Sequence, residues 1–81
     1  MKLTPGVSIA ATDSGAIVLD EGTGAMVHLN PSGYGCLQAA LDGNGVEAAA
    51  WLESTYRLDP GRARHDAHQL LRELQERGLL A

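Results

Sequence analysis

The chain has 81 residues, a formal net charge of −4, and a composition in which 44% of the residues are hydrophobic. A chain of this length forms one domain, residues 1–81, whose small core leaves little room for a deep catalytic pocket. Six Lys and Arg residues stand against ten Asp and Glu residues. This balance disfavours tight DNA binding, which often uses about 6–10 basic contacts to phosphates.

The chain has a single cysteine, Cys36, so it cannot form an internal disulfide. This is typical of proteins in a reducing cytoplasm. No apolar run is long enough to predict a membrane span. The N-terminal segment has one lysine and lacks a long apolar stretch, so it does not have the pattern of a signal peptide. We therefore expect a cytoplasmic protein.

The first third of the chain has the pattern of three short strands joined by tight turns. We expect the strands at Val7–Thr12, Ala16–Glu21 and Ala25–Asn30. Asp13-Ser14-Gly15 and Gly22-Thr23-Gly24 carry the residue types that close hairpins. The result is a three-stranded antiparallel sheet at the N-terminus.

The rest of the chain has the pattern of three helices. Asn30-Pro31 is a cap and start for a helix that runs to about Leu41, within which Gly33 and Gly35 indicate close packing. The second helix is capped by Asn44, with an inner stripe of Ala49, Leu52 and Tyr56. The third is capped by Asp59 and stops at Gly78, and Leu79-Leu80 can fold back onto the core. Its apolar positions are Ala63, Ala67, Leu70, Leu71 and Leu74.

The predicted fold class is therefore α+β, with the element order β-β-β-α-α-α. Three short helices beside a small sheet suggest a winged helix-turn-helix shape whose sheet lies at the N-terminus.

Several segments, in order, resemble the PqqD-like family of proteins that recognise the leaders of ribosomally made, modified peptides. They are Leu29-Asn30, Leu41-Asp42-Gly43, Tyr56–Asp59, Asp66, Leu70-Leu71 and Gly78-Leu79-Leu80. The Asn30-Pro31-Ser32-Gly33 start of the first helix and Trp51 look most like the free-standing type found in lasso peptide clusters. The resemblance covers about Pro5 to Leu80.

The resemblance implies a non-catalytic protein that binds a precursor leader and delivers it to maturation enzymes. The implied partners are a leader peptidase of the transglutaminase-like cysteine protease type and a cyclase. The leader would become an added antiparallel strand on the third strand, beside the last helix, and in lasso clusters it usually offers a Tyr-x-x-Pro-x-Leu stretch. No cofactor is implied.

The residues themselves point to the same place. The strand expected at 25–30 contains no proline, lysine or glutamate to protect its edge, so an extended peptide could pair with its backbone. On the last helix, spacing groups Asp66, Gln69, Leu70, Glu73 and Arg77 on one face. The candidate leader-binding residues are Ala25, Met26, Val27, His28, Leu29, Asp66, Gln69, Leu70, Glu73, Leu74 and Arg77.

Within this set, structural roles remain open alternatives. Alternation along the third strand favours Val27 and Leu29 as core residues and Met26 and His28 as residues of an open face. Leu70 belongs either to the groove or to the core, and Arg77 suits its own helix C-terminus.

Three other functions are compatible with parts of the pattern. A winged helix can bind DNA, but the few basic residues are scattered. An adaptor that binds a folded protein is a further alternative. An enzyme is disfavoured because Cys36 lies in an apolar helix and is expected to pack as a small hydrophobe. His65 and His68 lack the additional ligands of a zinc site, so no metal is expected.

Overall fold

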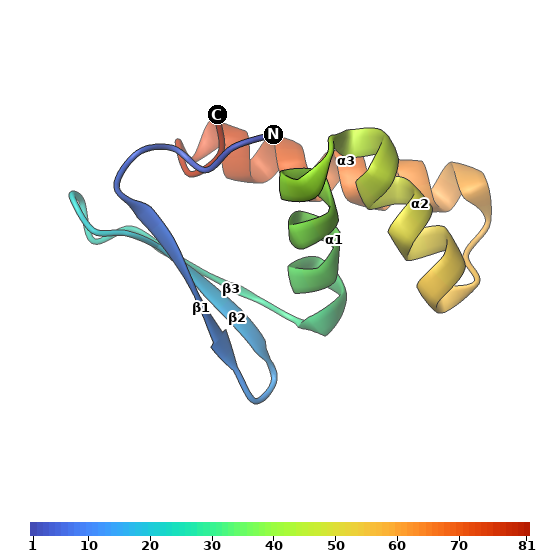
Figure 1. The fold of residues 1–81 in the computed structure, drawn as a ribbon, viewed down its shortest axis with the longest axis horizontal. Coiled ribbons are helices and arrows are strands. Elements are labelled where there is room, and N and C mark those ends of the chain that lie inside the picture. Colours follow the sequence, from blue (N-terminus) through green and yellow to red (C-terminus); the bar gives the residue numbers. More distant parts are fainter.

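The computed structural model describes residues 1–81 and contains three strands followed by three helices (Figure 1). The elements are β1 (Val7–Thr12), β2 (Gly15–Asp20), β3 (Met26–Leu29), α1 (Pro31–Asp42), α2 (Gly45–Tyr56) and α3 (Pro60–Glu76). The predicted α+β fold class and element order are confirmed. The third strand is shorter than expected, because Ala25 and Asn30 lie just outside it.

The sheet has the order β1-β2-β3, and both neighbouring pairs are antiparallel. Val18 in the central strand is paired with Ile9 on one side and Val27 on the other. Ala16, Val18 and Leu29 are buried, whereas Met26 and His28 on β3 are exposed. One face of the sheet therefore contributes to the core, as the alternation of β3 predicts.

Each helix begins at the cap that the sequence predicts. The Asn30 side chain accepts a hydrogen bond from the backbone N–H of Gly33 at 2.8 Å. Asn44 and Glu47 form a reciprocal capping box, and Asp59 accepts from two backbone N–H groups of α3. These side chains satisfy donors that would otherwise lack partners in the first turn, which fixes where each helix starts.

The core lies between the helices and the inner face of the sheet, and α2 packs along α3 on one side and α1 on the other. A β-carbon at Gly35 would overlap the indole ring of Trp51. The absence of a side chain there lets α1 and α2 approach closely, as the glycine pattern predicts.

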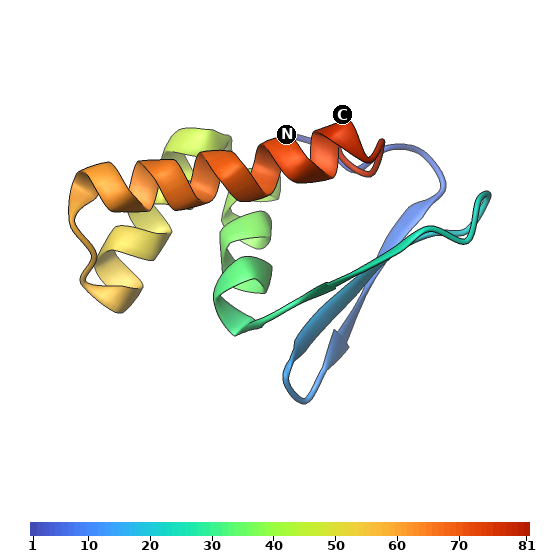
Figure 2. The ribbon, with the colours of Figure 1, turned by 180° about the vertical axis from the view of Figure 1, so that it is seen from behind.

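The chain ends return to the core at one end of α3 (Figure 2). Gly78 has a φ of 76°, a left-handed conformation that glycine adopts without strain. Leu79 and Leu80 are buried after this turn, and Leu80 forms a bridge with Leu3. The expected return of Leu79-Leu80 to the core is confirmed.

One core prediction is wrong. Tyr56 does not belong to the inner stripe of α2, because its side chain is 45% exposed. It is the last residue of the helix, and its ring meets the edge of Trp51 with centroids 5.7 Å apart. No helix of the structure is both long and apolar enough to cross a membrane.

Candidate functional site

β3 is an edge strand with a backbone partner on only one side, β2. Its other side pairs with no segment of the chain. α3 lies above this region in both views (Figures 1 and 2), and no Cα atom of α3 is within 8 Å of a Cα atom of β3. The predicted open edge is therefore present, with a helix beside it.

The register shows which groups of β3 face outward. The backbone N–H of Asp20 donates to the carbonyl of Ala25 at 2.8 Å, so this pair is a hydrogen-bonded pair of the ladder. Such pairs alternate along antiparallel strands. Val27 and Leu29 therefore also direct their backbone groups towards β2. The N–H and C=O groups of Met26 and His28 consequently point towards the open edge.

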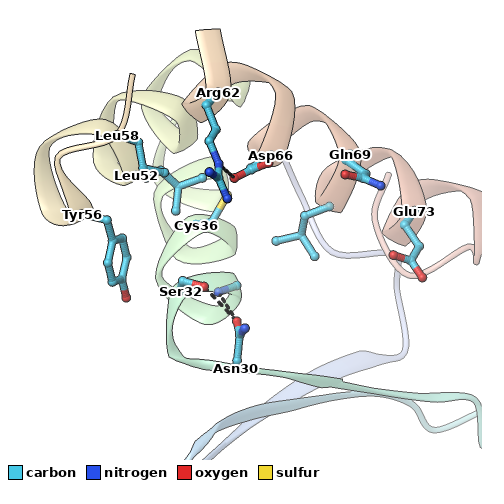
Figure 3. A pocket seen from close by; sticks show the side chains of 12 residues that line it. Asn30, Ser32, Cys36, Leu52, Tyr56, Leu58, Arg62, Asp66, Gln69 and Glu73 are labelled. Carbon is cyan, nitrogen blue, oxygen red and sulfur yellow. Dashed lines mark hydrogen bonds and ion pairs between the residues drawn. The ribbon is translucent and has the colours of Figure 1, made fainter. Parts of the chain in front are cut away.

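A cavity of about 470 Å³ lies where β3 ends and α1 begins, below α3. We call it the α1–α3 cavity (Figure 3). Its lining comes from the start of α1, the end of α2 and one face of α3: Asn30, Ser32, Gly33, Cys36, Leu52, Tyr56, Leu58, Arg62, Asp66, Gln69, Leu70 and Glu73. A volume of this size is within the range of about 300–1,000 Å³ found for ligand pockets.

The α3 wall of this cavity is built by helical spacing. Asp66, Gln69, Leu70 and Glu73 share one face, and all four line the cavity. Leu70 is half-buried and packs against the core cluster while it also faces the cavity, so both roles considered for it apply. Two carboxylates of this wall pair with arginines four residues away along the chain: Asp66 lies 3.6 Å from Arg62, and Glu73 lies 3.1 Å from Arg77.

Cys36 forms part of the cavity floor and is 1% exposed. Burial removes water from the thiolate form and raises the pKa of Cys36 to about 11, and the negative charge of Asp66 acts in the same direction. The thiol is therefore protonated at neutral pH. This is the state of a packed, unreactive cysteine, in agreement with its predicted role as a small hydrophobe.

The structure does not bring all the predicted residues to the site in the same way. The prediction that Leu74 contacts the leader is wrong. Leu74 is 1% exposed and belongs to the core, because it follows Ala67 and Leu71 on the inner stripe of α3. Its side chain cannot reach a guest at the surface. Leu29 is likewise buried, and Val27 is half-buried, so these two offer no open side chain.

Two further predicted residues lie at the margin of the site. Ala25 precedes β3, and its carbonyl is already bonded to Asp20 within the hairpin. Arg77 follows α3 and does not line the cavity, although its ion pair with Glu73 connects it to the cavity wall.

The contribution of α1 and α2 was missing from the sequence-based prediction. Ser32, Gly33 and Cys36 face the cavity from the first turns of α1, while Tyr56 and Leu58 do so from the end of α2. These positions depend on how the helices cross, which no local pattern specifies. The exposed aromatic at the end of α2, close to a helix stop, was the one available signal. The structure contains no group of three or more His, Cys, Asp or Glu side chains that could hold a metal ion.

Comparisons with a protein-family model and with solved structures agree on the family of this chain. The family model described as coenzyme PQQ synthesis protein D (PqqD) matches residues 15–80. A solved structure of lasso peptide synthetase B1 complexed with the leader peptide is 33% identical, covering 96% of this chain and 93% of that one with a TM-score of 0.87. A second, TbiB1 in complex with the TbiA(beta) leader peptide, is 25% identical, covering 99% and 94%, also with a TM-score of 0.87. No curated protein sequence matches significantly. The resemblance drawn from the sequence is thus confirmed: this chain belongs to the PqqD family.

Proposed function

We propose that this chain is a non-catalytic protein that binds the leader segment of a ribosomally made precursor peptide. The leader adds an antiparallel strand to β3 and lies beside α3. The observation that carries this proposal is the open backbone edge of Met26 and His28 next to the α1–α3 cavity. An extended peptide gains hydrogen bonds from such an edge and specificity from pockets beside it.

The cavity is needed because backbone pairing alone is not enough. An unstructured leader loses entropy when it becomes ordered, which costs roughly 2–5 kcal/mol of the gross interaction energy. The apolar walls of the cavity, Leu52, Leu58 and Leu70, can bury one or two guest side chains. Interfaces usually derive most of their affinity from a few such buried anchors. Met26, with a side chain 52% exposed, offers a further apolar contact on the strand itself.

The structural relatives support this function. The lasso peptide synthetase B1 structure and the TbiB1 structure were both solved with leader peptides, and both share the fold over nearly the whole of this chain. By analogy, the leader partner of this chain belongs to a lasso peptide precursor. We further infer that the bound leader is delivered to a leader peptidase of the transglutaminase-like cysteine protease type and then to a cyclase. A free, protonated Cys36 thiol fits the reducing cytoplasm in which ribosomal precursors are made.

The test removes one outward N–H group from β3. In His28→Pro the edge loses a donor, and the pyrrolidine ring obstructs the pairing of a guest strand. We expect leader affinity to fall at least about tenfold, since one hydrogen bond is worth roughly 0.5–1.5 kcal/mol and the ring adds a steric cost. The measurement is fluorescence anisotropy of a labelled synthetic leader.

The matched control is Ala11→Pro on β1. By the same alternation, Ala11 directs its N–H away from β2, on the opposite edge of the sheet. Both variants therefore place a proline on an exposed edge strand, and only one of them lies beside the cavity. Equal losses in the two variants, or no loss in His28→Pro, would contradict strand addition to β3.

A further inference from the structure

A second cavity, of about 660 Å³, lies on the other side of α3, between that helix and the first half of α2. We call it the α2–α3 groove. At roughly 100° per residue, Arg64, His68 and Arg72 lie about 100–180° around α3 from Asp66 and Glu73, which face the α1–α3 cavity. The buried stripe of α3 separates the two. A guest in one site therefore leaves the other free.

The floor of the groove is aliphatic and accessible. Ala49 and Leu71 are buried at its base, and Ala50 is exposed beside them. Val46 lines the groove with 75% of its surface exposed, the highest value among the large apolar side chains. Val46 occupies the first turn of α2, where no packing role requires a valine. Such a surface gains free energy when a guest apolar side chain covers it.

The rim of the groove is basic in a chain whose net charge is −4. Arg64, His68 and Arg72 follow one another at intervals of four residues on α3, and all three line the groove. Arg64 forms no ion pair, and Arg72 has only a solvent-exposed one with Glu76 at 3.6 Å, which is worth little. Glu53 is the single acidic residue of the lining. The α1–α3 cavity has the opposite balance, because its lining holds two carboxylates, Asp66 and Glu73, and one basic residue, Arg62.

From this floor and rim, we propose that the α2–α3 groove docks an acidic segment of the leader peptidase that acts on the bound leader. The segment carries one or two aliphatic side chains between carboxylates. The aliphatic groups cover Val46 and Ala50, and the carboxylates meet Arg64 and Arg72. This inference rests on the proposed function, because it takes the enzyme from the delivery role. It adds that enzyme and leader bind simultaneously, on opposite sides of α3.

The test uses the full chain, the purified leader peptidase of the proposed pathway, and a labelled leader. Arg64→Glu with Arg72→Glu reverses the rim, and Val46→Ser removes the apolar contact at an exposed helix position. We expect the rim variant to weaken peptidase binding about tenfold or more, with an effect that shrinks at high salt, because exposed charges are screened within about 8 Å at physiological ionic strength. Leader affinity should stay within about twofold of the wild type in both variants, since distant sites act independently.

The matched control is Lys2→Glu with Arg57→Glu, which changes the net charge equally at two residues outside both cavities. The docking site is overturned if this control weakens peptidase binding as much as the rim variant does, or if the rim variant binds the peptidase normally. Neither result affects the proposal that the chain captures a leader. Competition between saturating leader and peptidase also overturns the docking site. If the wild-type chain does not bind the peptidase, both the docking site and the delivery role are overturned. Leader capture is tested separately, by the fluorescence anisotropy of the labelled leader. Rim-dependent binding of a short DNA duplex, with peptidase binding unaffected, assigns the groove to nucleic acid instead.

Discussion

The helical part and the sheet of this chain differ in how completely their backbone polar groups are satisfied. All three helices begin with a side-chain cap, and the carbonyl of Leu74 near the end of α3 accepts from Leu79. The sheet, in contrast, has three strands and two unprotected edges. A structure that is closed in one part and open in the other can accept a guest strand without breaking its own hydrogen bonds.

The two edges of the sheet are not equivalent. β1 and β3 both pair only with β2, but only β3 leads into the α1–α3 cavity, through Asn30. The lesson is that an open edge becomes a specific site only where a rigid part of the fold supplies side-chain contacts beside it. The following predictions separate the contribution of the helices from that of the sheet.

The largest effect is expected for Leu70→Asp, which puts a charge on the cavity wall. Burying an unpaired carboxylate against a guest side chain is costly, and we expect leader affinity to fall about a hundredfold, corresponding to about 2.7 kcal/mol. Gln75→Asp is the control: it makes the same change of charge on the same helix, on the side of the α2–α3 groove. Fluorescence anisotropy with a labelled leader measures both. If the Leu70→Asp variant is folded, as judged by circular dichroism, and binds the leader normally, α3 does not contribute to the leader site.

Gly35→Ala tests the closed, helical part. The added methyl group would overlap the Trp51 ring, so the indole must move or α1 must shift away from α2. We expect the free energy of unfolding to fall by about 1–2 kcal/mol, because overpacking outweighs the roughly 1 kcal/mol gained from alanine's helix propensity.

Gly45→Ala is the matched control, because a β-carbon there meets only Leu71, at an ordinary contact distance of 3.9 Å. This variant should be as stable as the wild type or more so. Urea unfolding followed by tryptophan fluorescence compares the two. If both glycines tolerated alanine equally well, the close approach of α1 and α2 would not contribute to stability.

The smallest effect at neutral pH concerns Cys36, which lines the α1–α3 cavity. Its pKa in the folded state, about 11, exceeds the ordinary value of 9.0, so folding favours the protonated thiol. The stabilisation is fully present below pH 9 and is lost as the pH rises through about 11. We expect a loss on the order of 2 kcal/mol over this interval. Urea unfolding at several alkaline pH values should show a steeper decline for the wild type than for Cys36→Ala, and parallel curves would contradict it. Leader binding at neutral pH should be nearly the same in both.

The sequence predicts the local features of this molecule well, because each has a local physical cause. Asn30, Asn44 and Asp59 cap helices through side chains that bond within the next three residues. The alternation along β3 follows from strand geometry alone. These patterns were enough for the element order and for the open edge.

Features that depend on the crossing of helices were not predictable in the same way. Spacing placed Leu70 and Leu74 on neighbouring faces of one helix, but only the tertiary packing around α3 decides that Leu74 is covered while Leu70 borders a cavity. For the same reason the sequence predicts Tyr56 in the core and does not indicate that Ser32 and Gly33 line the site. The α2–α3 groove is also a product of tertiary packing.

The alternation of outward groups on β3 has a consequence for the evolution of precursors. Only Met26 and His28 present free backbone groups, so an added strand is held at a fixed phase, and a slip of one residue would turn every one of its side chains to the wrong face. Only every second leader residue then faces the protein. In the proposed complex, the residues between them are free to vary, and one recognition protein can serve precursors that differ at half of their paired positions.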